Sequence, residues 1–341
     1  MTEKQYGGAS SFGFKDKIGD SKDSSKQVVT KVAKEKIFDD TFSEIDSDSL
    51  EKYIKAGEIS IKVKEYAKEI TKKDVLLVEI ADKIEERIKE LGGEIAFPVN
   101  ISINEIAAHY TPSARDEARA SGLIKIDVGI EVDGFISDSA VSFDLTDDQR
   151  YAEMIKINKW ALDSALEKLE IGSPLKVVGN AISEVVQKDG RFKIIRNLTG
   201  HGLDKDNIHA GITVSNLKNE SNFVLKDMAI AIEPFLTTGA GEIFEGKPSE
   251  IYILQQEKLP RDRDARKLLE FISENYRTKP FCKKWIERSG LAKPNYCLSV
   301  LVKEGILYNF PVLIEKDKKP VSQMEHTVVF ADKVYVTTKG L

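Results

Sequence analysis

Cysteine and long apolar runs are both scarce in this sequence, and each shortage limits what the protein can be. Only Cys282 and Cys297 occur among the 341 residues. Two cysteines form neither a disulfide framework nor a CxxC metal site, which indicates a reducing compartment. No apolar run approaches the ~18–20 residues of a membrane span, and the N-terminus lacks the basic-then-apolar pattern of a secretory signal. We therefore expect a soluble, cytoplasmic protein without a membrane partner.

Several local catalytic signatures are also missing. There is no HExxH, no GxSxG, no Walker loop and no complete GxGxxG, so zincin-type, serine-hydrolase, P-loop and dinucleotide-binding chemistry lack support. The 51 basic residues are outnumbered by 56 acidic ones, for a net charge of −5. This balance argues against DNA as a partner and leaves room only for a local basic patch.

The composition divides the chain into a tail and one large domain. Residues 1–47 are rich in Ser, Gly, Lys and Asp without a sustained apolar period, which predicts a disordered or weakly ordered tail. Residues 48–341 form the predicted folded domain, and the whole chain is 41% hydrophobic. Its first helices are predicted at about 59–70 and 77–91, where Gly92-Gly93 is a C-terminal signal.

The remainder of the domain alternates strands with helices. Thr146 is predicted to cap a helix that ends near residue 169, and Ser173-Pro174 to open another that ends near 187. Strands are predicted over 95–103, 192–198, 212–214, 227–235, 251–255, 310–314 and 327–330. A helical insert subdomain over about 258–322, with helices at 262–274, 280–288 and 294–304, is predicted because it exceeds an ordinary connection in length.

One hairpin organises the candidate site. Residues 126–143 form two strand-like runs around Asp133-Gly134, a strong signal for a two-residue turn. The resulting register places Asp127 and Asp138 on one face as diagonal neighbours, roughly 7–8 Å apart at the backbone. Two such carboxylates repel each other unless a cation joins them, so they indicate either a metal site or two solvated acids.

Further donors favour the metal site. His201 lies between two glycines, and Glu233 and Glu325 stand at the ends of apolar, strand-like runs. Each residue taken singly is more simply a hydrogen-bonded histidine or an ion-paired glutamate. Together with Asp127 and Asp138 they give five ligands, too many for one structural zinc and suited to two divalent ions bridged by carboxylates.

Five motifs in order resemble those of the methionine aminopeptidases, in particular the archaeal style of the type 2 enzymes. They are NISINEIAAHYTP, IDVG…DGFISDSA, LTGHGLDKDNIHAG, AIEPF and QMEHT. The resemblance covers about residues 48–341. It implies the pita-bread fold, an α/β (α+β) architecture in which two pseudo-twofold halves enclose an antiparallel sheet, with the helical insert typical of type 2.

The same resemblance implies roles for individual residues. Asp127 would bind one metal, His201 and Glu233 the other, and Asp138 and Glu325 both; the ions would be Co, Mn, Fe or Zn. Glu233 would also act as general base. His109 and His209 would be catalytic neighbours that bind the substrate amide and stabilise the tetrahedral intermediate. The methionine pocket would be lined by Phe97, Asn100, Ile208 and Phe310, with His209 at its edge.

The implied activity is removal of the initiator methionine from nascent polypeptides with a small second residue, through attack by a metal-activated water. Nascent N-termini would be the substrates of a monomeric enzyme, and the ribosome is a further candidate partner. An Xaa-Pro aminopeptidase or prolidase would share the five ligands, although such enzymes usually carry a large N-terminal domain. A non-catalytic relative that binds ribosomes or RNA would have no physical reason to keep the buried charges.

The ligand assignment makes the first prediction. Asp138→Ala or Glu325→Ala is expected to abolish turnover of Met-Xaa peptides, because each removes a carboxylate shared by both ions. The fold is expected to persist, so circular dichroism should stay near that of the parent while the release of methionine is lost. Full activity in either variant would contradict the two-metal assignment.

Overall fold

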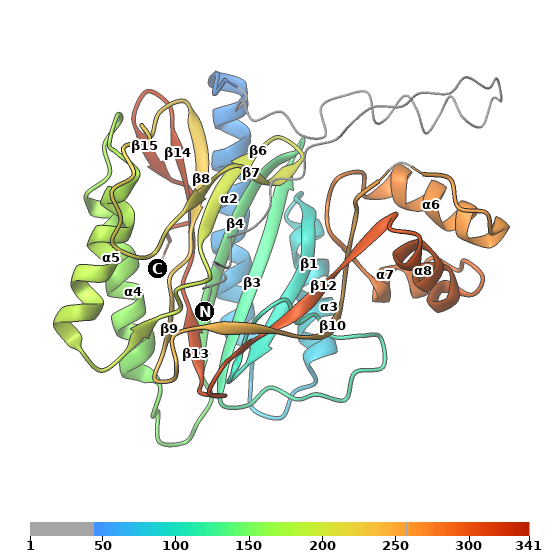
Figure 1. Ribbon diagram of the computed structural model, residues 1–341, viewed down its shortest axis with the longest axis horizontal. Helices are drawn as coiled ribbons and strands as arrows, with labels where there is room; N and C mark the ends of the chain where they lie inside the picture. The colour runs from blue at the N-terminus through green and yellow to red at the C-terminus, as the bar shows by residue number, and fades with distance from the viewer. Residues whose placement is uncertain (1–43, 257, 341) are drawn as a thin grey trace, which may run out of the picture.

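The computed structural model describes residues 44–256 and 258–340, in which helices lie against antiparallel sheets (Figure 1). The first two helices are α2 (Ser47–Ile70) and α3 (Leu77–Glu90). Asp46 caps α2 by accepting a hydrogen bond from the Ser49 amide at 2.8 Å. Gly92, with φ of 81°, follows α3 as its sequence predicts. The predicted tail lies almost wholly outside the described residues.

The predicted hairpin is confirmed, register included. β3 (Leu123–Val132) pairs with β4 (Phe135–Asp144), with Asp127 opposite Ala140 and Gly129 opposite Asp138. Asp133 and Gly134 both have positive φ, the conformation of the twist-compatible two-residue turn. β1 (Glu94–Ile103) completes the sheet on its outer side, in the order β1-β3-β4, with register shifts around Pro98.

A second layered unit follows the hairpin. Helices α4 (Ala152–Glu167) and α5 (Lys176–Asp189) pack on a five-stranded sheet of order β15-β14-β8-β6-β7. Its strands are β6 (Gly200–Asp204), β7 (Asn207–Val214), β8 (Met228–Ile232), β14 (His326–Phe330) and β15 (Val334–Val336). The segments around His201 and His209, interpreted from sequence as connections between strand pieces, are therefore strands themselves.

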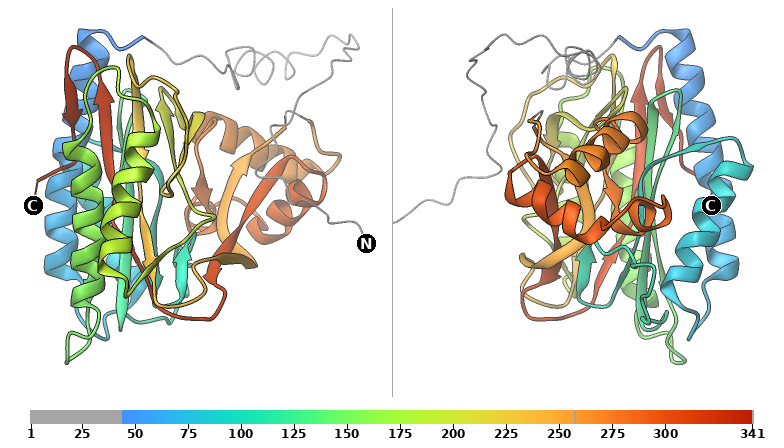
Figure 2. Two further views of the ribbon diagram at one scale, coloured as in Figure 1. Left: turned by 60° about the vertical axis from the view of Figure 1, so that its left-hand side comes forward. Right: turned by 90° about the vertical axis from the view of Figure 1, so that its right-hand side faces the viewer.

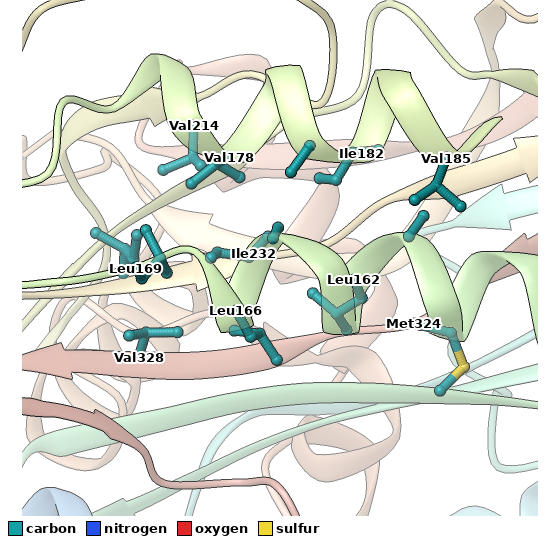
Figure 3. Close-up of a cluster of buried hydrophobic side chains, with 14 of the residues drawn as sticks. Leu162, Leu166, Leu169, Val178, Ile182, Val185, Val214, Ile232, Met324 and Val328 are labelled. Carbon is teal, nitrogen blue, oxygen red and sulfur yellow. The ribbon is translucent and has the colours of Figure 1, made fainter. Parts of the chain in front are cut away.

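Each unit has its own apolar core between helices and sheet. In the second, Leu162 and Leu166 of α4 and Ile182 of α5 meet the strand residues Ile232 and Val328 (Figure 3). In the first, Ile80, Ile84 and Ile88 recur at helical spacing on α3 and pack with Ile126 and Val128 of β3. Burying these stripes leaves the opposite faces of the sheets free to carry polar side chains.

Two further sheets complete the main body. One has the order β13-β9-β5, from β5 (Lys193–Ile194), β9 (Phe235–Thr237) and β13 (Val321–Gln323). The other has the order β11-β10-β12-β2, from β2 (Ile106–Ala108), β10 (Ile243–Leu254), β11 (Phe281–Cys282) and β12 (Leu307–Glu315). β10 and β12 form a long antiparallel pair that reaches out to the C-terminal helices (Figure 1).

Three helices project from this long pair: α6 (Arg263–Asn275), α7 (Lys283–Arg288) and α8 (Pro294–Lys303). The three helices lie together at one side of the molecule (Figure 2, right). They enclose a separate apolar cluster that includes Leu268, Ile286 and Leu301. A buried ion pair connects them to α3, because the Lys284 amine donates to Asp82 at 2.7 Å and to Glu85 at 3.1 Å. The short strand β11 precedes α7, where the sequence predicts helix from residue 280.

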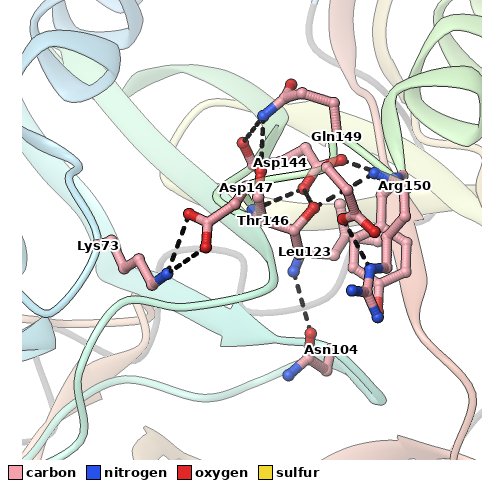
Figure 4. A network of polar contacts seen from close by, with 10 residues as sticks. Lys73, Asn104, Leu123, Asp144, Thr146, Asp147, Gln149 and Arg150 are labelled. Atoms are coloured by element: carbon pink, nitrogen blue, oxygen red, sulfur yellow. Dashed lines mark hydrogen bonds and ion pairs between the residues drawn. The ribbon is translucent and has the colours of Figure 1, made fainter.

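The start of α4 corrects one prediction. Thr146 does not cap this helix, which begins at Ala152. Asp144 instead organises the preceding turn: its carboxylate accepts from the Thr146 amide at 2.9 Å and from the Tyr151 amide at 2.6 Å (Figure 4). A threonine close to an aspartate can join such a turn as readily as it caps a helix. Here Asp144 accepts the hydrogen bond from the Tyr151 amide, directly before the helix.

A seam of hydrogen bonds connects β4 to the segment around β14. The Asp138 amide donates to Thr327 Oγ1 at 2.7 Å, and that hydroxyl donates to the Asp138 carbonyl at 2.7 Å. The Glu325 amide donates to the Ala140 carbonyl at 3.1 Å. These bonds hold the end of the chain against the hairpin. In the described ranges, no helix has the length and apolar character that crossing a membrane requires.

Close packing of α2 on the C-terminal segment generates a stability prediction. A Cβ at Gly57 would lie 2.3 Å from the Thr337 carbonyl oxygen. Gly57→Ala is therefore expected to lower the free energy of unfolding by about 1–3 kcal/mol, although alanine normally stabilises a helix by about 1 kcal/mol relative to glycine. Chemical denaturation measures this. Glu58→Ala, at the exposed neighbour, should change stability by less than about 0.5 kcal/mol; a stabilised Gly57→Ala would contradict the close contact.

Candidate functional site

The five predicted ligands come from five different places in the chain. Asp127 lies on β3, Asp138 on β4, His201 on β6, Glu233 directly after β8, and Glu325 between β13 and β14. One ligand atom from each of Asp138, His201 and Glu325 lies within 4.8 Å of the other two. Glu233 joins them, because its Oε1 is 3.8 Å from His201 Nε2.

The protonation of His201 indicates what this group of side chains can hold. Its Nδ1 lies 3.1 Å from the Gly202 carbonyl oxygen, which can only accept, so Nδ1 carries the proton. Burial lowers the pKa of His201 to about 4, which keeps the ring neutral at neutral pH. Nε2 therefore directs a lone pair at Asp138 Oδ2, 3.5 Å away, and at Glu233 Oε1. Three acceptors that face one another in this way are the surroundings of a cation.

The carboxylates show the same deficit of positive charge. Asp127 Oδ1, Asp138 Oδ1 and Glu325 Oε2 are buried and have no hydrogen-bond partner within the described part of the chain. The pKa values of Asp127, Glu233 and Glu325 are raised well above the usual range. Burial is the larger cause, and repulsion from Asp138 is the second. Burial also raises the pKa of Asp138 to about 7. Hard oxygen ligands with one neutral imidazole fit divalent metal ions.

Three residues that the sequence did not single out support the ligands. Gln323 Nε2 donates to Asp127 Oδ2 at 3.0 Å, and Thr327 holds the backbone of Asp138. Lys64 of α2 lies behind the site, where Glu325 and Asp138 attract its charge. Gln323 and Thr327 are each two residues from Glu325, so a search for buried polar neighbours of the last motif could have found them. Lys64 offers no such signal.

His209 lies beside the candidate ligand His201, and His109 lies near His209. The His209 ring is exposed, and its centroid is 4.4 Å from that of His201. His109 follows β2 with φ of 61°, and its Nδ1 is 3.3 Å from the Pro311 carbonyl oxygen. That contact puts the proton on Nδ1 and leaves Nε2 as an acceptor. Burial lowers the pKa of His109 to about 4, so the ring is neutral.

The predicted pocket residues fall into two groups. Phe97 and Ile208 belong to one buried cluster, and the Phe97 ring covers Gly129, where a Cβ would lie 2.2 Å from ring carbons. Phe310 lies instead beside His109, with ring centroids 5.3 Å apart. Asn100 pairs with Asp127 across β1 and β3, and its Oδ1 is buried without a partner among the described residues. Of the four, Asn100 lies opposite a candidate ligand, whereas Phe310 lies next to His109.

Comparison with known proteins gives a consistent result over nearly the whole chain. Residues 51–332 match the model of metallopeptidase family M24. A methionine aminopeptidase of Pyrococcus horikoshii is 40% identical over 296 residues, which cover 85% of this chain and 99% of the relative. One of Archaeoglobus fulgidus is also 40% identical, over 299 residues, covering 86% of this chain and 100% of the relative.

Solved structures agree on the fold. A thermophilic Arx1 superposes with a TM-score of 0.76 at 16% identity, over 87% of this chain and 92% of the other. Methionine aminopeptidase of Thermotoga maritima superposes with a TM-score of 0.64 at 19% identity, over 88% of this chain and 100% of the other. Prolidase of Pyrococcus furiosus superposes with a TM-score of 0.53 at 18% identity, over 87% of this chain and 66% of the other. The expected mixed α/β pita-bread architecture with antiparallel sheets is confirmed.

The raised carboxylate pKa values predict how pH acts on the metal-free protein. The unfolded chain loses the Asp138 proton near pH 4, whereas the folded chain keeps it to about pH 7. Stability is therefore present at low pH and lost as pH rises through that interval. In chelator-treated protein, the Tm is expected to fall over this range, and less steeply in Asp138→Asn.

Asp147→Asn, at an exposed carboxylate, is the matched control and should keep the pH dependence of the parent. Added Mn²⁺ should raise the Tm of the parent most at the higher pH values, since the ligands must be deprotonated to bind it. An Asp138→Asn profile parallel to the parent profile would contradict the raised pKa of this carboxyl.

Proposed function

Because the chain belongs to metallopeptidase family M24 and, within it, to the methionine aminopeptidases, we propose that it removes the N-terminal methionine from nascent polypeptides whose second residue is small. One observation carries this proposal. Ligand atoms of Asp138, His201 and Glu325 meet at a single buried point, all within 4.8 Å of one another, and both carboxyl groups have a buried oxygen without a partner among the described residues. Such a point has a use in metal-dependent hydrolysis and costs stability otherwise.

We infer that the five ligands hold two divalent ions, drawn from Co, Mn, Fe or Zn. Asp127 would serve one ion, His201 and Glu233 the other, and Asp138 and Glu325 both. The central position of Asp138, which faces His201 and perturbs the carboxyls of Asp127, Glu233 and Glu325, supports its bridging role. When bound, such ions lower the pKa of a water molecule and polarise a carbonyl group.

Glu233 is the proposed general base. It directly follows β8, its side chain is 15% exposed, and burial together with repulsion from Asp138 raises its pKa. A base of raised pKa accepts a proton readily near neutral pH. It would take the proton from the attacking water and pass it to the departing amine, so that the carboxyl returns to its starting state.

The two histidines would divide the work on the substrate peptide. His109 Nε2 is an acceptor, which suits the N–H of the substrate amide. Within the described ranges, the His209 ring makes no hydrogen bond to a carbonyl oxygen. His209 lies exposed next to His201, where an N–H can stabilise the negative oxygen of the tetrahedral intermediate. This assignment predicts different roles for two residues that the sequence alone treats alike.

The methionine side chain would lie against Phe97, Ile208 and Phe310. The first two share one apolar cluster, and the third stacks edge-on against His109. An apolar, aromatic wall suits the polarizable thioether of methionine. Asn100 Oδ1 lies opposite Asp127 and has no partner among the described residues, so it would accept from the substrate's free amine. Recognition of that amine would restrict cleavage to the first residue of a chain.

We also infer the wider setting. The protein would act as a cytoplasmic monomer on nascent chains, with the ribosome as a candidate partner; its two cysteines are both free and buried. Its two layered units, each with a helix pair over an antiparallel sheet, would be pseudo-twofold halves. The helices between residues 263 and 303 would be the type 2 insert, inside a subdomain of about 258–322.

Substrate choice tests the proposed function. The metal-loaded protein is expected to release methionine from Met-Ala-Ser and to leave Ala-Pro-Ser intact, because the pocket requires a long apolar first side chain. Asp127→Asn should lose this activity, whereas Asp133→Asn, at the exposed tip of the same hairpin, should keep it. Cleavage of Ala-Pro-Ser alone would indicate the Xaa-Pro alternative. Metal binding without any cleavage would indicate the non-catalytic one.

A further inference from the structure

A groove runs between α2 and α4 on the outside of the molecule. It has a volume of about 710 Å³ and lies over β4, between the C-terminal half of α2 and the first half of α4. These helices stand side by side on the outer layer, α2 in blue and α4 in green (Figure 2, left). None of the residues proposed above as metal ligands or substrate contacts lines this groove, so it is a separate site.

The lining of the groove has an unusual excess of positive charge. It includes six lysines but, among the described residues that form it, only one carboxylate, that of Asp144. The lysines are Lys64, Lys68, Lys72, Lys73, Lys156 and Lys159. The Asp144 carboxylate already accepts hydrogen bonds from Thr146 and Tyr151. Two of the lysines also contact carboxylates just outside the lining, Lys73 with Asp147 at 3.1 Å and Lys156 with Glu153 at 3.5 Å. In a chain with a net charge of −5, six lysines against these three carboxylates still leave a local excess of positive charge, which marks a site for anions.

The floor of the groove is apolar, in contrast to its rim. Val141 and Phe143 of β4 form the base, with Ile61 of α2 on one side and Ile155 of α4 on the other. All four are only partly buried, so their apolar surface is available to a ligand. Hydrocarbon placed there would leave water, which is favourable by about 25 cal/mol per Å² of apolar surface buried.

Lys64 connects the floor to the rim. It is partly buried in the wall of the groove, and its amine donates to the Thr338 carbonyl at 3.0 Å. One of the three protons of an ammonium group is used in this bond, and the other two remain for further acceptors. Burial lowers the pKa of Lys64 to about 8, so the amine is still charged at neutral pH.

We propose that this groove binds an organic anion with an apolar body, such as a medium-chain carboxylate. The hydrocarbon would lie on Val141 and Phe143, and the anionic head would meet Lys64, Lys68 and Lys156. A volume of about 710 Å³ is in the range of small-molecule sites, roughly 300–1,000 Å³. A nucleic acid fits less well, because single strands bind through rows of aromatic side chains and the lining contains one phenylalanine.

The test uses the full chain loaded with metal and the dye 1-anilinonaphthalene-8-sulfonate, which joins an apolar ring system to a sulfonate. Fluorescence titration should show binding that weakens at least tenfold in the double variant Lys68→Glu/Lys156→Glu. Lys62→Glu/Lys188→Glu is the matched control: both residues are exposed lysines outside the groove, and binding should stay within twofold. Equal binding by the two double variants would overturn the proposal.

Competition then identifies the ligand class. Decanoate should displace the dye, and decanol, which lacks the charge, should do so at least tenfold less well. Displacement by heparin or an acidic peptide but not by decanoate would overturn the proposal in favour of a polyanion surface. Ala152→Trp, which adds a large side chain at the exposed start of α4, should block dye and decanoate alike.

Release of methionine from Met-Ala-Ser separates this inference from the proposed function. The groove variants are expected to keep the parent kcat/KM within twofold, because none of the substituted residues, Lys68, Lys156 and Ala152, is assigned to the metal centre or to its support. Loss of dye binding together with normal turnover supports a second site. Loss of turnover in Lys68→Glu/Lys156→Glu, with the dye still bound, would overturn the separation of the two sites. A parent protein that binds the dye but cleaves no peptide would refute the proposed function alone.

Discussion

Repulsion among buried carboxylates is the constraint on which the rest of this structure depends. Asp138 and Glu325 are almost completely buried, with Asp127 and Glu233 beside them, and the one imidazole among them offers a lone pair instead of a proton. Isolated, such a group would destabilise the fold unless the acids took up protons, which is the direction of their pKa shifts. A divalent cation removes that conflict, so the same residues that cost stability provide affinity.

The fold meets this constraint by holding each acid on rigid backbone. The seam between β4 and β14 does most of this: Thr327 bonds both the amide and the carbonyl of Asp138, and the Glu325 amide bonds Ala140. Asp138 and Glu325 are therefore fixed relative to each other by hydrogen bonds to their main-chain atoms. Two separate apolar cores, one behind each sheet, supply the stability that lets the strands carry charge on their facing sides.

The sequence predicts the parts of this site that depend on local rules. The Asp133-Gly134 turn sets the hairpin register, and the register places Asp127 and Asp138 on one face. Sequence patterns are less informative where the secondary structure of a segment depends on partners far away in the chain. The segments of His201 and His209 are strands because β6 and β7 pair with each other and β6 pairs with β8, and Thr146 joins a turn because Asp144 takes the amides. Gln323 and Thr327 matter only through residues almost two hundred positions away.

The two sides of β4 carry opposite charges, with the candidate ligand acids on one side and the lysines of the groove between α2 and α4 on the other. The acids therefore give the groove residue Lys64 a structural role in addition to binding a ligand. Lys64 approaches the site from behind, where attraction to Glu325 and Asp138 offsets part of the cost of burying its amine. The acids in turn gain a cation that needs no metal. This attraction is weak compared with direct coordination, because the amine bonds the Thr338 carbonyl and not a carboxylate. A long-range attraction of this kind leaves the remaining protons of the amine available, so Lys64 can serve the acids and an external anion at the same time.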